Sequence, residues 1–189
     1  NGKTSSELAD FYSKVNSSNM GFVNQPEPKG FGDAVLRARP YVRGVTLVHA
    51  GDTYIISRNH DHLKRLVDRF NEHEAEAAIL FQEVEDPRPF GVAITEIAPD
   101  DTLIVKKVVE KPEKPISNLI ILPIYIFTEK IFDMLEEVRP GKGGEIQLTD
   151  GIQMLLDKGY RVVGTKLKKD EIRLDIGSPT TLIEALQMS

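Results

Sequence analysis

The chain has 189 residues, 40% of them hydrophobic, and a formal net charge of −5 at pH 7, which is enough apolar content for one buried core and one domain over residues 1–189. The acidic balance argues against a nucleic-acid partner, because non-specific binding to nucleic acid depends on Lys and Arg neutralising phosphates. The sequence has no cysteine, which excludes a disulfide framework, a thiolate metal site and a thiol nucleophile, and fits a reducing compartment such as the cytoplasm.

The first half of the chain alternates helix patterns with strand patterns. Thr4 and Glu7 form a capping-box pattern ahead of apolar residues at helical spacing. Along the chain we expect an amphipathic helix over residues 5–15, a short strand at 22–23, a brief helix over 32–38, a buried strand over 45–48, a helix over 61–70 and a strand over 77–81. This order is typical of crossover units on a largely parallel sheet, so the sequence predicts a Rossmann-like α/β core.

The second half begins with an antiparallel β insertion. Two β-rich runs, 90–97 and 102–109, are joined across residues 99–101, which is a hairpin pattern. After it we expect a buried strand over 120–127, helices over 129–137 and 146–158, strands over 160–167 and 172–174, and a last helix beginning at Ser178-Pro179.

No segment of the sequence predicts contact with a membrane. The longest apolar run, residues 119–127, is far shorter than the roughly 20 residues that cross a bilayer, and Pro123 interrupts it. No basic start followed by an apolar stretch and a cleavage site is visible, so we expect no signal peptide and a cytoplasmic protein. The sequence starts at Asn1 rather than Met, and we expect a further segment upstream.

Two aspartates stand at strand ends far apart in the sequence. Asp52 follows the strand predicted over 45–48, and Asp175 follows the strand over 172–174 and precedes Gly177. Alpha/beta sheets place ligands in the crevice beyond the carboxyl ends of their strands, and Mg²⁺ is commonly held by one or two carboxylates with substrate phosphates. From the residues alone, an ordinary turn aspartate explains each position equally well.

Two further stretches carry groups that suit a phosphorylated ligand. Residues 25–34 contain Gly30 and lie between a strand and a helix, where bare backbone can approach a flat ligand, although the third glycine of a dinucleotide fingerprint is absent. Glu110 and Lys111 put a carboxylate and an ammonium side by side at a strand end, suited to sugar hydroxyls and to a phosphate. A Pro/Gly turn and an exposed charged strand end are the simpler alternatives.

Read in order, these pieces resemble the sugar-1-phosphate nucleotidyltransferase family over residues 1–189. Each motif is short, but seven of them in the family's order make a specific signal. The motifs are residues 25–34, 50–52, 90–92, 109–112, 117–118, 144–150 and 174–177. The contexts of 117–120 and 144–150 look more like the branch that forms UDP-glucose than the branch that uses dTTP.

The resemblance implies a nucleotide-diphospho-sugar transferase fold and a reaction in which UTP and glucose 1-phosphate give UDP-glucose and pyrophosphate, with Mg²⁺ as cofactor. The attacking phosphate is already anionic, so positioning and charge neutralisation are needed more than a covalent catalyst or a general base. The residues implied are Gln25, Gly30, Ala50 and Gly51 for the nucleotide, Gly91, Glu110, Lys111, Asn118 and Glu145 for the sugar phosphate, Asp52 and Asp175 for the metal, and Lys111, Asp52 and Asp175 for catalysis.

Two features depart from the family pattern. The family's opening glycine-rich loop, with its arginine and nearby lysine, is expected upstream of Asn1, so we expect the chain as given to keep part of a UDP-glucose pocket with little turnover. Leu122-Pro123 stands where many members have a small residue and glycine beside the sugar, which leaves the hexose open. A dTTP-using thymidylyltransferase and a non-catalytic nucleotide-sugar-binding regulatory module remain alternatives, and a homo-oligomer is left open.

Overall fold

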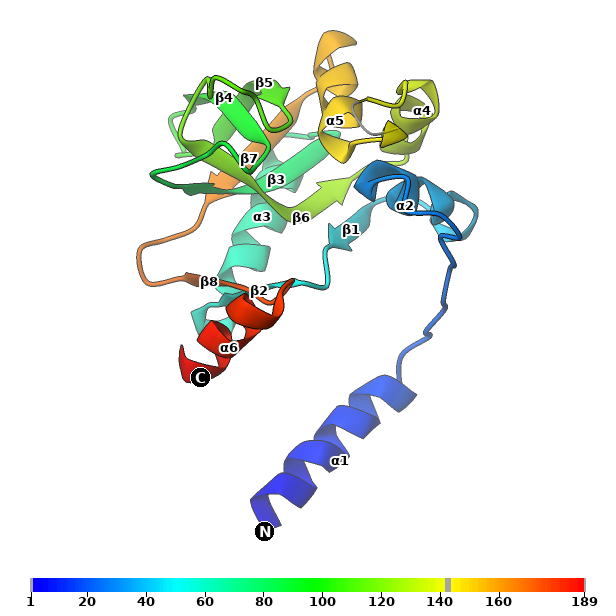
Figure 1. Cartoon of the computed structure of the whole chain (residues 1–189), viewed down its shortest axis with the longest axis vertical. Coiled ribbons are helices and arrows are strands. Elements are labelled where there is room, and N and C mark those ends of the chain that lie inside the picture. Colours follow the sequence, from blue (N-terminus) through cyan, green and yellow to red (C-terminus); the bar gives the residue numbers. More distant parts are fainter. Residues whose placement is uncertain (1, 142–143, 189) are drawn as a thin grey trace.

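The computed structural model describes residues 2–141 and 144–188 (Figure 1). In this part of the chain, six strands form one sheet in the order β1-β6-β3-β7-β5-β4, and two more form the ribbon β2-β8. The strands are β1 (Thr46–His49), β2 (Thr53–Ile56), β3 (Ala77–Glu83), β4 (Val92–Ile97), β5 (Leu103–Val109), β6 (Leu119–Phe127), β7 (Val162–Lys166) and β8 (Ile172–Asp175). The α-helices are α1 (Gly2–Asn16), α2 (Phe31–Arg37), α3 (Asp61–Glu72), α4 (Lys130–Glu137), α5 (Leu148–Asp157) and α6 (Pro179–Met188), and two short 3₁₀ turns cover Arg39–Tyr41 and Arg58–His60.

Most of the predicted elements are confirmed, including the hairpin of β4 and β5 and all six α-helices. The strand predicted at Phe22 and Val23 is wrong, because residues 21–30 form no strand and the Phe22 side chain is 92% exposed. A strand is stable only beside a partner, and no described strand pairs with this segment. Strand β2 was not predicted from the sequence, and its partner β8 lies about 120 residues away in the chain.

The sheet is α/β as expected, but its pairings are mixed rather than largely parallel. Of the described pairs in the sheet, only β3 with β7 is parallel. The reason is β6, which lies between β1 and β3 and runs antiparallel to both. β1, β3 and β7 therefore do point the same way, as crossover units require, and the antiparallel β6 separates the first two of them.

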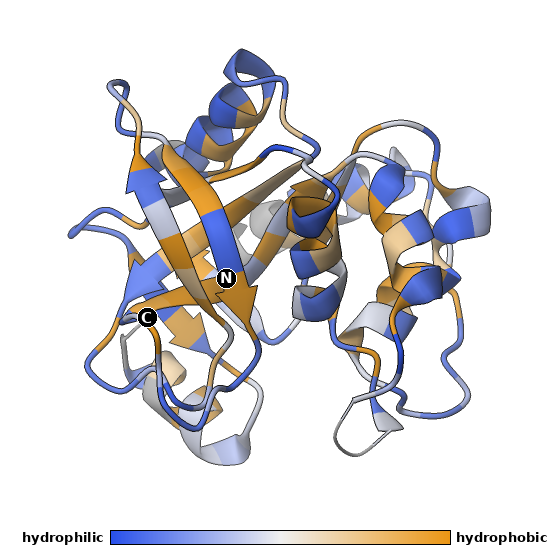
Figure 2. Ribbon diagram, turned by 90° about the horizontal axis from the view of Figure 1, so that it is seen from above, coloured by the Kyte–Doolittle hydropathy of each residue, from blue (hydrophilic) through white to orange (hydrophobic). Residues whose placement is uncertain are grey.

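The sheet has an apolar core on each face. Eight of the nine residues of β6, all but Pro123, alternate between the two cores, so the sequence of this strand is a nearly continuous apolar run. Tyr125 and Phe127 face a core shared with α2, α4 and α5, whereas Ile124 and Ile126 face a core shared with α3. Figure 2 shows the hydrophobic residues concentrated on the strands and alternating with hydrophilic residues along the helices.

β1 and α1 are less covered than the sequence predicts. β1 was expected to be a buried strand, but it is an edge strand whose residues are half-buried or exposed, because only β6 pairs with it among the described strands. The helix α1 is confirmed, but Figure 1 shows it standing apart from the sheet. Its apolar residues Leu8, Phe11 and Tyr12 are 50%, 58% and 57% exposed. None of the described helices has the length and apolar character that a membrane span requires.

The ends of β4 and β5 curl back toward β6. Val92 of β4 pairs with Ile120 of β6, and the Ile121 N–H donates to the Gly91 carbonyl over 2.8 Å. The Lys111 N–H donates to the Phe90 carbonyl over 3.2 Å. These bonds bring the start of β4 and the end of β5 together near the start of β6.

Candidate functional site

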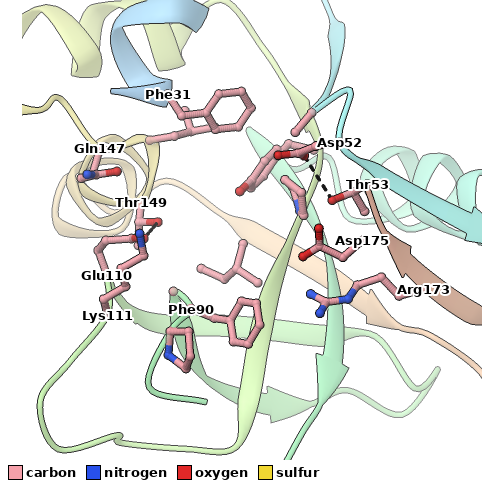
Figure 3. Close-up of a pocket in the computed structure, with 17 residues that line it drawn as sticks. Phe31, Asp52, Thr53, Phe90, Glu110, Lys111, Gln147, Thr149, Arg173 and Asp175 are labelled. Carbon is pink, nitrogen blue, oxygen red and sulfur yellow. Dashed lines mark hydrogen bonds and ion pairs between the residues drawn. The ribbon is translucent and has the colours of Figure 1, made fainter. Parts of the chain in front are cut away.

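A cavity of about 410 Å³ opens where the sheet meets the ribbon β2-β8 (Figure 3). Its volume lies within the range of small-molecule sites. The lining comes mainly from five stretches that are far apart in sequence, namely residues 50–53, 89–91, 110–111, 147–149 and 173–175. The fold therefore collects at one place most of the motifs that the sequence analysis singled out.

Asp52 and Asp175 meet on one wall of this cavity. The antiparallel register of the ribbon puts Thr53 opposite Asp175, and the Ile176 N–H donates to the Asp52 carbonyl over 2.8 Å. A carbon placed at the Cβ position of Gly177 would lie 3.2 Å from Asp52 Oδ2 and 3.3 Å from Asp175 Oδ1. Both carboxylates thus face one small gap, which the glycine leaves open.

This pair suits a divalent cation whose coordination a substrate completes. Within residues 2–141 and 144–188 no cluster of three or more His, Cys, Asp or Glu could hold a metal by itself. Asp175 Oδ1 already accepts bonds from the Gly177 N–H at 2.9 Å and the Thr181 hydroxyl at 3.4 Å, which leaves its other oxygen for a ligand. Two carboxylates with phosphate oxygens and water are a common Mg²⁺ donor set, so the chemistry of these residues fits.

Glu110, Lys111 and Gly91 form another part of the cavity wall. Thr149 Oγ1 donates a 2.7 Å hydrogen bond to Glu110 Oε2, and Lys111 Nζ lies 3.7 Å from Glu110 Oε1. A Cβ on Gly91 would come within 3.0 Å of Glu110 Oε2 and 3.2 Å of Thr149 Oγ1. Glycine at this position keeps the backbone close to the carboxylate, and Lys111, whose side chain is 61% exposed, supplies a cation at the rim.

Aromatic rings close the inner side of the cavity. Tyr125 stacks on Phe127 with ring centroids 5.4 Å apart and also contacts Phe31 of α2. Burial, helped by the negative charge of Glu110, raises the pKa of Tyr125 far above its usual range, so the phenol stays neutral. This wall is an apolar surface and supplies no charge to a ligand.

Gln25 and Gly30 do not line the cavity. Gln25 Nε2 donates to Asp33 Oδ2 at 2.7 Å and to the Gly30 carbonyl at 3.1 Å, so its amide nitrogen is engaged within the protein. The hydrogen bonds from Gln25 and from Arg37 hold the pKa of Asp33 below its ordinary value.

Gly30 packs instead against the loop that precedes α5. A Cβ on Gly30, whose φ is +94°, would lie 2.6 Å from the Ile146 carbonyl oxygen. The Gly32 N–H donates to that same oxygen over 2.9 Å, and the Ile146 N–H donates to the Lys29 carbonyl over 2.8 Å. Two sequence motifs, 25–34 and 144–150, are therefore joined backbone to backbone.

The other predicted residues are divided between the cavity and its surroundings. Ala50 lines the cavity, and its N–H donates to the Pro123 carbonyl over 3.0 Å, whereas Gly51 lies in the turn behind it. Glu145 accepts a 2.6 Å bond from Gln147 and is exposed outside the cavity. Asn118 lines a different cavity, of about 330 Å³, beside the β4-β5 hairpin.

Several lining residues were not predicted individually as site residues, among them Phe31, Tyr125, Thr149 and Arg173. Tyr125 was only part of a predicted buried strand, and Phe31 and Thr149 were each only one letter of a motif. Arg173 precedes Asp175 by two positions on a strand, and the two-residue period of a strand could have placed both side chains on one face. The lining also shows Thr149 at the start of α5, directly against Glu110.

Comparison with known proteins decides the family. A family model described as "Nucleotidyl transferase" matches residues 3–188. The chain belongs to the nucleotidyl transferase family. This confirms the family resemblance found in the sequence.

The chain is similar to several members of the nucleotidyl transferase family. It is 36% identical over 177 residues to a UTP–glucose-1-phosphate uridylyltransferase of Pseudomonas aeruginosa, which covers 90% of this chain and 62% of that protein. It is 32% identical over 168 residues to the low-salt glycan biosynthesis nucleotidyltransferase Agl11 of Haloferax volcanii, which covers 88% of this chain and 44% of that protein. The chain thus spans less than two thirds of the length of these relatives.

A solved structure confirms the fold. A crystal structure of UDP-glucose pyrophosphorylase complexed with UDP-glucose superposes with a TM-score of 0.87 at 29% identity, covering 96% of this chain and 70% of the other. The mixed sheet with flanking helices is therefore the nucleotidyltransferase fold that the sequence predicts.

Proposed function

We propose that this protein is a nucleotidyltransferase that forms UDP-glucose and pyrophosphate from UTP and glucose 1-phosphate. One observation carries the proposal: a single cavity holds the Asp52–Asp175 carboxylate pair on one wall and the Glu110–Lys111 pair with Gly91 on another. The similarity to a uridylyltransferase and to a structure that contains UDP-glucose supports this substrate class.

Each group in the cavity has a proposed role. Asp52 and Asp175 would hold Mg²⁺, and the ion when bound would supply positive charge to the phosphates. Glu110 would accept hydrogen bonds from sugar hydroxyls beside Gly91, and Lys111 would hold the phosphate of the sugar phosphate. Ala50 lies where it could contact the nucleotide. The nucleotide roles of Gln25, Gly30 and Gly51 and the sugar roles of Asn118 and Glu145 stay predictions from the sequence.

The proposed reaction needs no proton acceptor among these residues. An oxygen of the sugar phosphate, already anionic, attacks the α-phosphorus of the nucleotide, and the bond from that phosphorus to the bridging oxygen of the β-phosphate breaks as pyrophosphate leaves. The residues of the cavity would bind and align two anionic substrates, which is where positioning and preorganised charge act on the rate.

Binding and turnover are tested separately. Calorimetry should detect UDP-glucose binding that strengthens with Mg²⁺. A coupled assay on the full-length protein should detect pyrophosphate release from UTP and glucose 1-phosphate, with dTTP and ATP as competing nucleotides. Asp52→Asn and Asp175→Asn should each remove the Mg²⁺ dependence of binding, whereas the exposed Asp170→Asn should keep it. A cavity that prefers dTTP would point to a thymidylyltransferase, and binding without turnover by the full-length protein would point to a regulatory module. Failure to bind any nucleotide sugar would reject the proposal.

Assembly and compartment are further parts of the proposal. The exposed apolar side chains of Leu8, Phe11 and Tyr12 support a homo-oligomer, because contiguous apolar surface marks interaction sites. Sedimentation at increasing protein concentration tests it, and a constant monomer mass would reject it.

We also propose that the protein acts in the cytoplasm on small-molecule substrates, without nucleic acid or membrane, as its composition suggests.

A further inference from the structure

Arg173 is a cationic side chain on the cavity wall that no motif identified. It lies on β8 two residues before Asp175, so the alternation of a strand puts both side chains on the same face. Figure 3 shows its guanidinium reaching from β8 toward Phe90. The guanidinium carbon lies 5.0 Å from the centroid of the Phe90 ring, which is a cation–π distance.

The guanidinium has no anionic partner in the part of the chain that the structure describes. Neither an ion pair nor a hydrogen bond engages its N–H donors there, although Asp52, Asp175 and Glu110 line the same cavity. Arg173 is half-buried, and a partly buried donor set without acceptors is unfavourable. Stacking on Phe90 therefore holds a charged guanidinium, whose N–H donors have no acceptor among the described residues, at the edge of the cavity.

The other cation of the cavity is differently placed. Lys111 Nζ lies 3.7 Å from a Glu110 oxygen, so its charge is already partly compensated. Without the bound cation, the three carboxylates outnumber this one partly compensated ammonium, which is unfavourable for an anionic ligand. Arg173 is the cationic lining residue whose charge no carboxylate of the described chain compensates.

We propose that Arg173 binds a phosphate group of the nucleotide sugar, in the space between Phe90 and Asp175. This inference rests on the proposed function, because it names which residue of that site receives the phosphate. A planar guanidinium matches phosphate oxygens with two parallel N–H bonds, which a lysine cannot reproduce. Phe90 acts as the positioning residue that keeps the guanidinium plane facing the cavity.

The test compares ligands with and without phosphate on matched variants. UDP-glucose affinity in the presence of Mg²⁺ is measured by calorimetry, and uridine affinity by ligand-observed NMR, for the wild type, Arg173→Met and Arg173→Lys. Arg58→Met is the control, since Arg58 is exposed just beyond β2 and does not line the cavity. Arg173→Met should bind UDP-glucose about tenfold to a hundredfold more weakly, as expected for a lost charge-assisted hydrogen bond, and should bind uridine unchanged.

The other two variants have defined expected results. Arg173→Lys should bind UDP-glucose severalfold more weakly than the wild type, and Arg58→Met should bind it as tightly as the wild type. If the wild type binds UDP-glucose and Arg173→Met binds it equally tightly, the assignment is wrong and the proposed function stands. If Arg173→Met weakens uridine as much as UDP-glucose, the residue acts through the shape of the site and the assignment is also wrong. Absence of UDP-glucose binding by the wild type overturns the proposed function and this inference with it. If Arg173→Met does not fold, the affinities of Arg173→Lys for UDP-glucose and for uridine are compared with those of the wild type instead.

Discussion

Glu110 is oriented in the cavity by a hydroxyl from another element. Thr149 donates to it from the first turn of α5, and Gly91 leaves the space in which the two side chains meet. Thr149 is only 5% exposed, so water replaces its hydroxyl poorly. The direction in which Glu110 presents its second oxygen therefore depends on a residue that is 39 positions away.

Thr149→Val keeps the shape of this side chain and removes the donor. We expect UDP-glucose to bind about three- to tenfold more weakly and the free energy of unfolding to fall by about 1 kcal/mol, the usual value of one hydrogen bond. Calorimetry and urea unfolding measure the two effects. Thr149→Ser, which keeps the hydroxyl, should recover most of the affinity, and a serine variant as weak as valine would contradict the role given to the bond.

At the scale of elements, a buried carboxylate ties the ribbon β2-β8 to α3. The Glu171 side chain is 3% exposed and accepts bonds from Arg65 at 2.6 and 2.9 Å, from Ser57 at 3.0 Å and from the Lys168 N–H at 2.8 Å. Burial alone would raise the pKa of Glu171, but these hydrogen bonds outweigh it and lower the pKa to about 2. The connection fixes the ribbon that carries Asp52 and Asp175.

Glu171→Gln should destabilise the protein by about 3 kcal/mol at pH 7, since removing one partner of a buried ion pair leaves the other uncompensated. Because the folded pKa is depressed, the carboxylate stabilises the fold fully above its ordinary pKa of 4.5 and loses this effect as the pH falls toward 2. The difference between wild type and variant should therefore shrink between about pH 5 and pH 2 in denaturant unfolding. The exposed Glu83→Gln should change little at any pH, and a pH-independent difference for Glu171→Gln would contradict the assignment.

At the scale of the whole molecule, stability resides in the sheet and the helices that cover its two faces. Both apolar cores are built from residues 31–167, with α3 on one face and α2, α4 and α5 on the other. Within α1, residues 8–16 add nothing to either core, and Figure 1 shows the helix apart from the sheet. Whether residues 1–189 behave as one domain stays a prediction.

At protein concentrations low enough to keep the chain monomeric, deleting residues 1–16 should change the free energy of unfolding of the remaining chain by no more than about 0.5 kcal/mol, because surface changes away from packed contacts have small effects. Urea unfolding followed by far-ultraviolet circular dichroism measures this, with the lost helical signal as a built-in control. A loss of several kcal/mol under these conditions would mean that α1 packs on the body of its own chain, whereas a loss seen only at high protein concentration would support the proposed homo-oligomer.

Most of the helices and strands, several residues of the cavity, and the family could be predicted from the sequence. Helical spacing, caps and helix-breaking residues marked each described α-helix, and apolar or β-rich runs marked most strands, because these signals follow from local backbone geometry. Asp52, Asp175, Glu110, Lys111 and Gly91 were all named from strand ends and motifs, and the family was named correctly. Each of these signals lies within a short stretch of sequence, so it can be recognised without knowing which distant residues the stretch contacts.

The tertiary structure decided what depends on partners far away in sequence. The segment at Phe22 reads as a strand but has no described neighbour with which to pair, and β1 reads as buried but lies at an edge. Likewise, Gln25 bonds to Asp33 instead of facing the cavity, and Arg173 faces the cavity with no anionic partner among the described residues. Pairing, burial and charge compensation are properties of the assembled chain, because each is set by which distant groups come within contact distance.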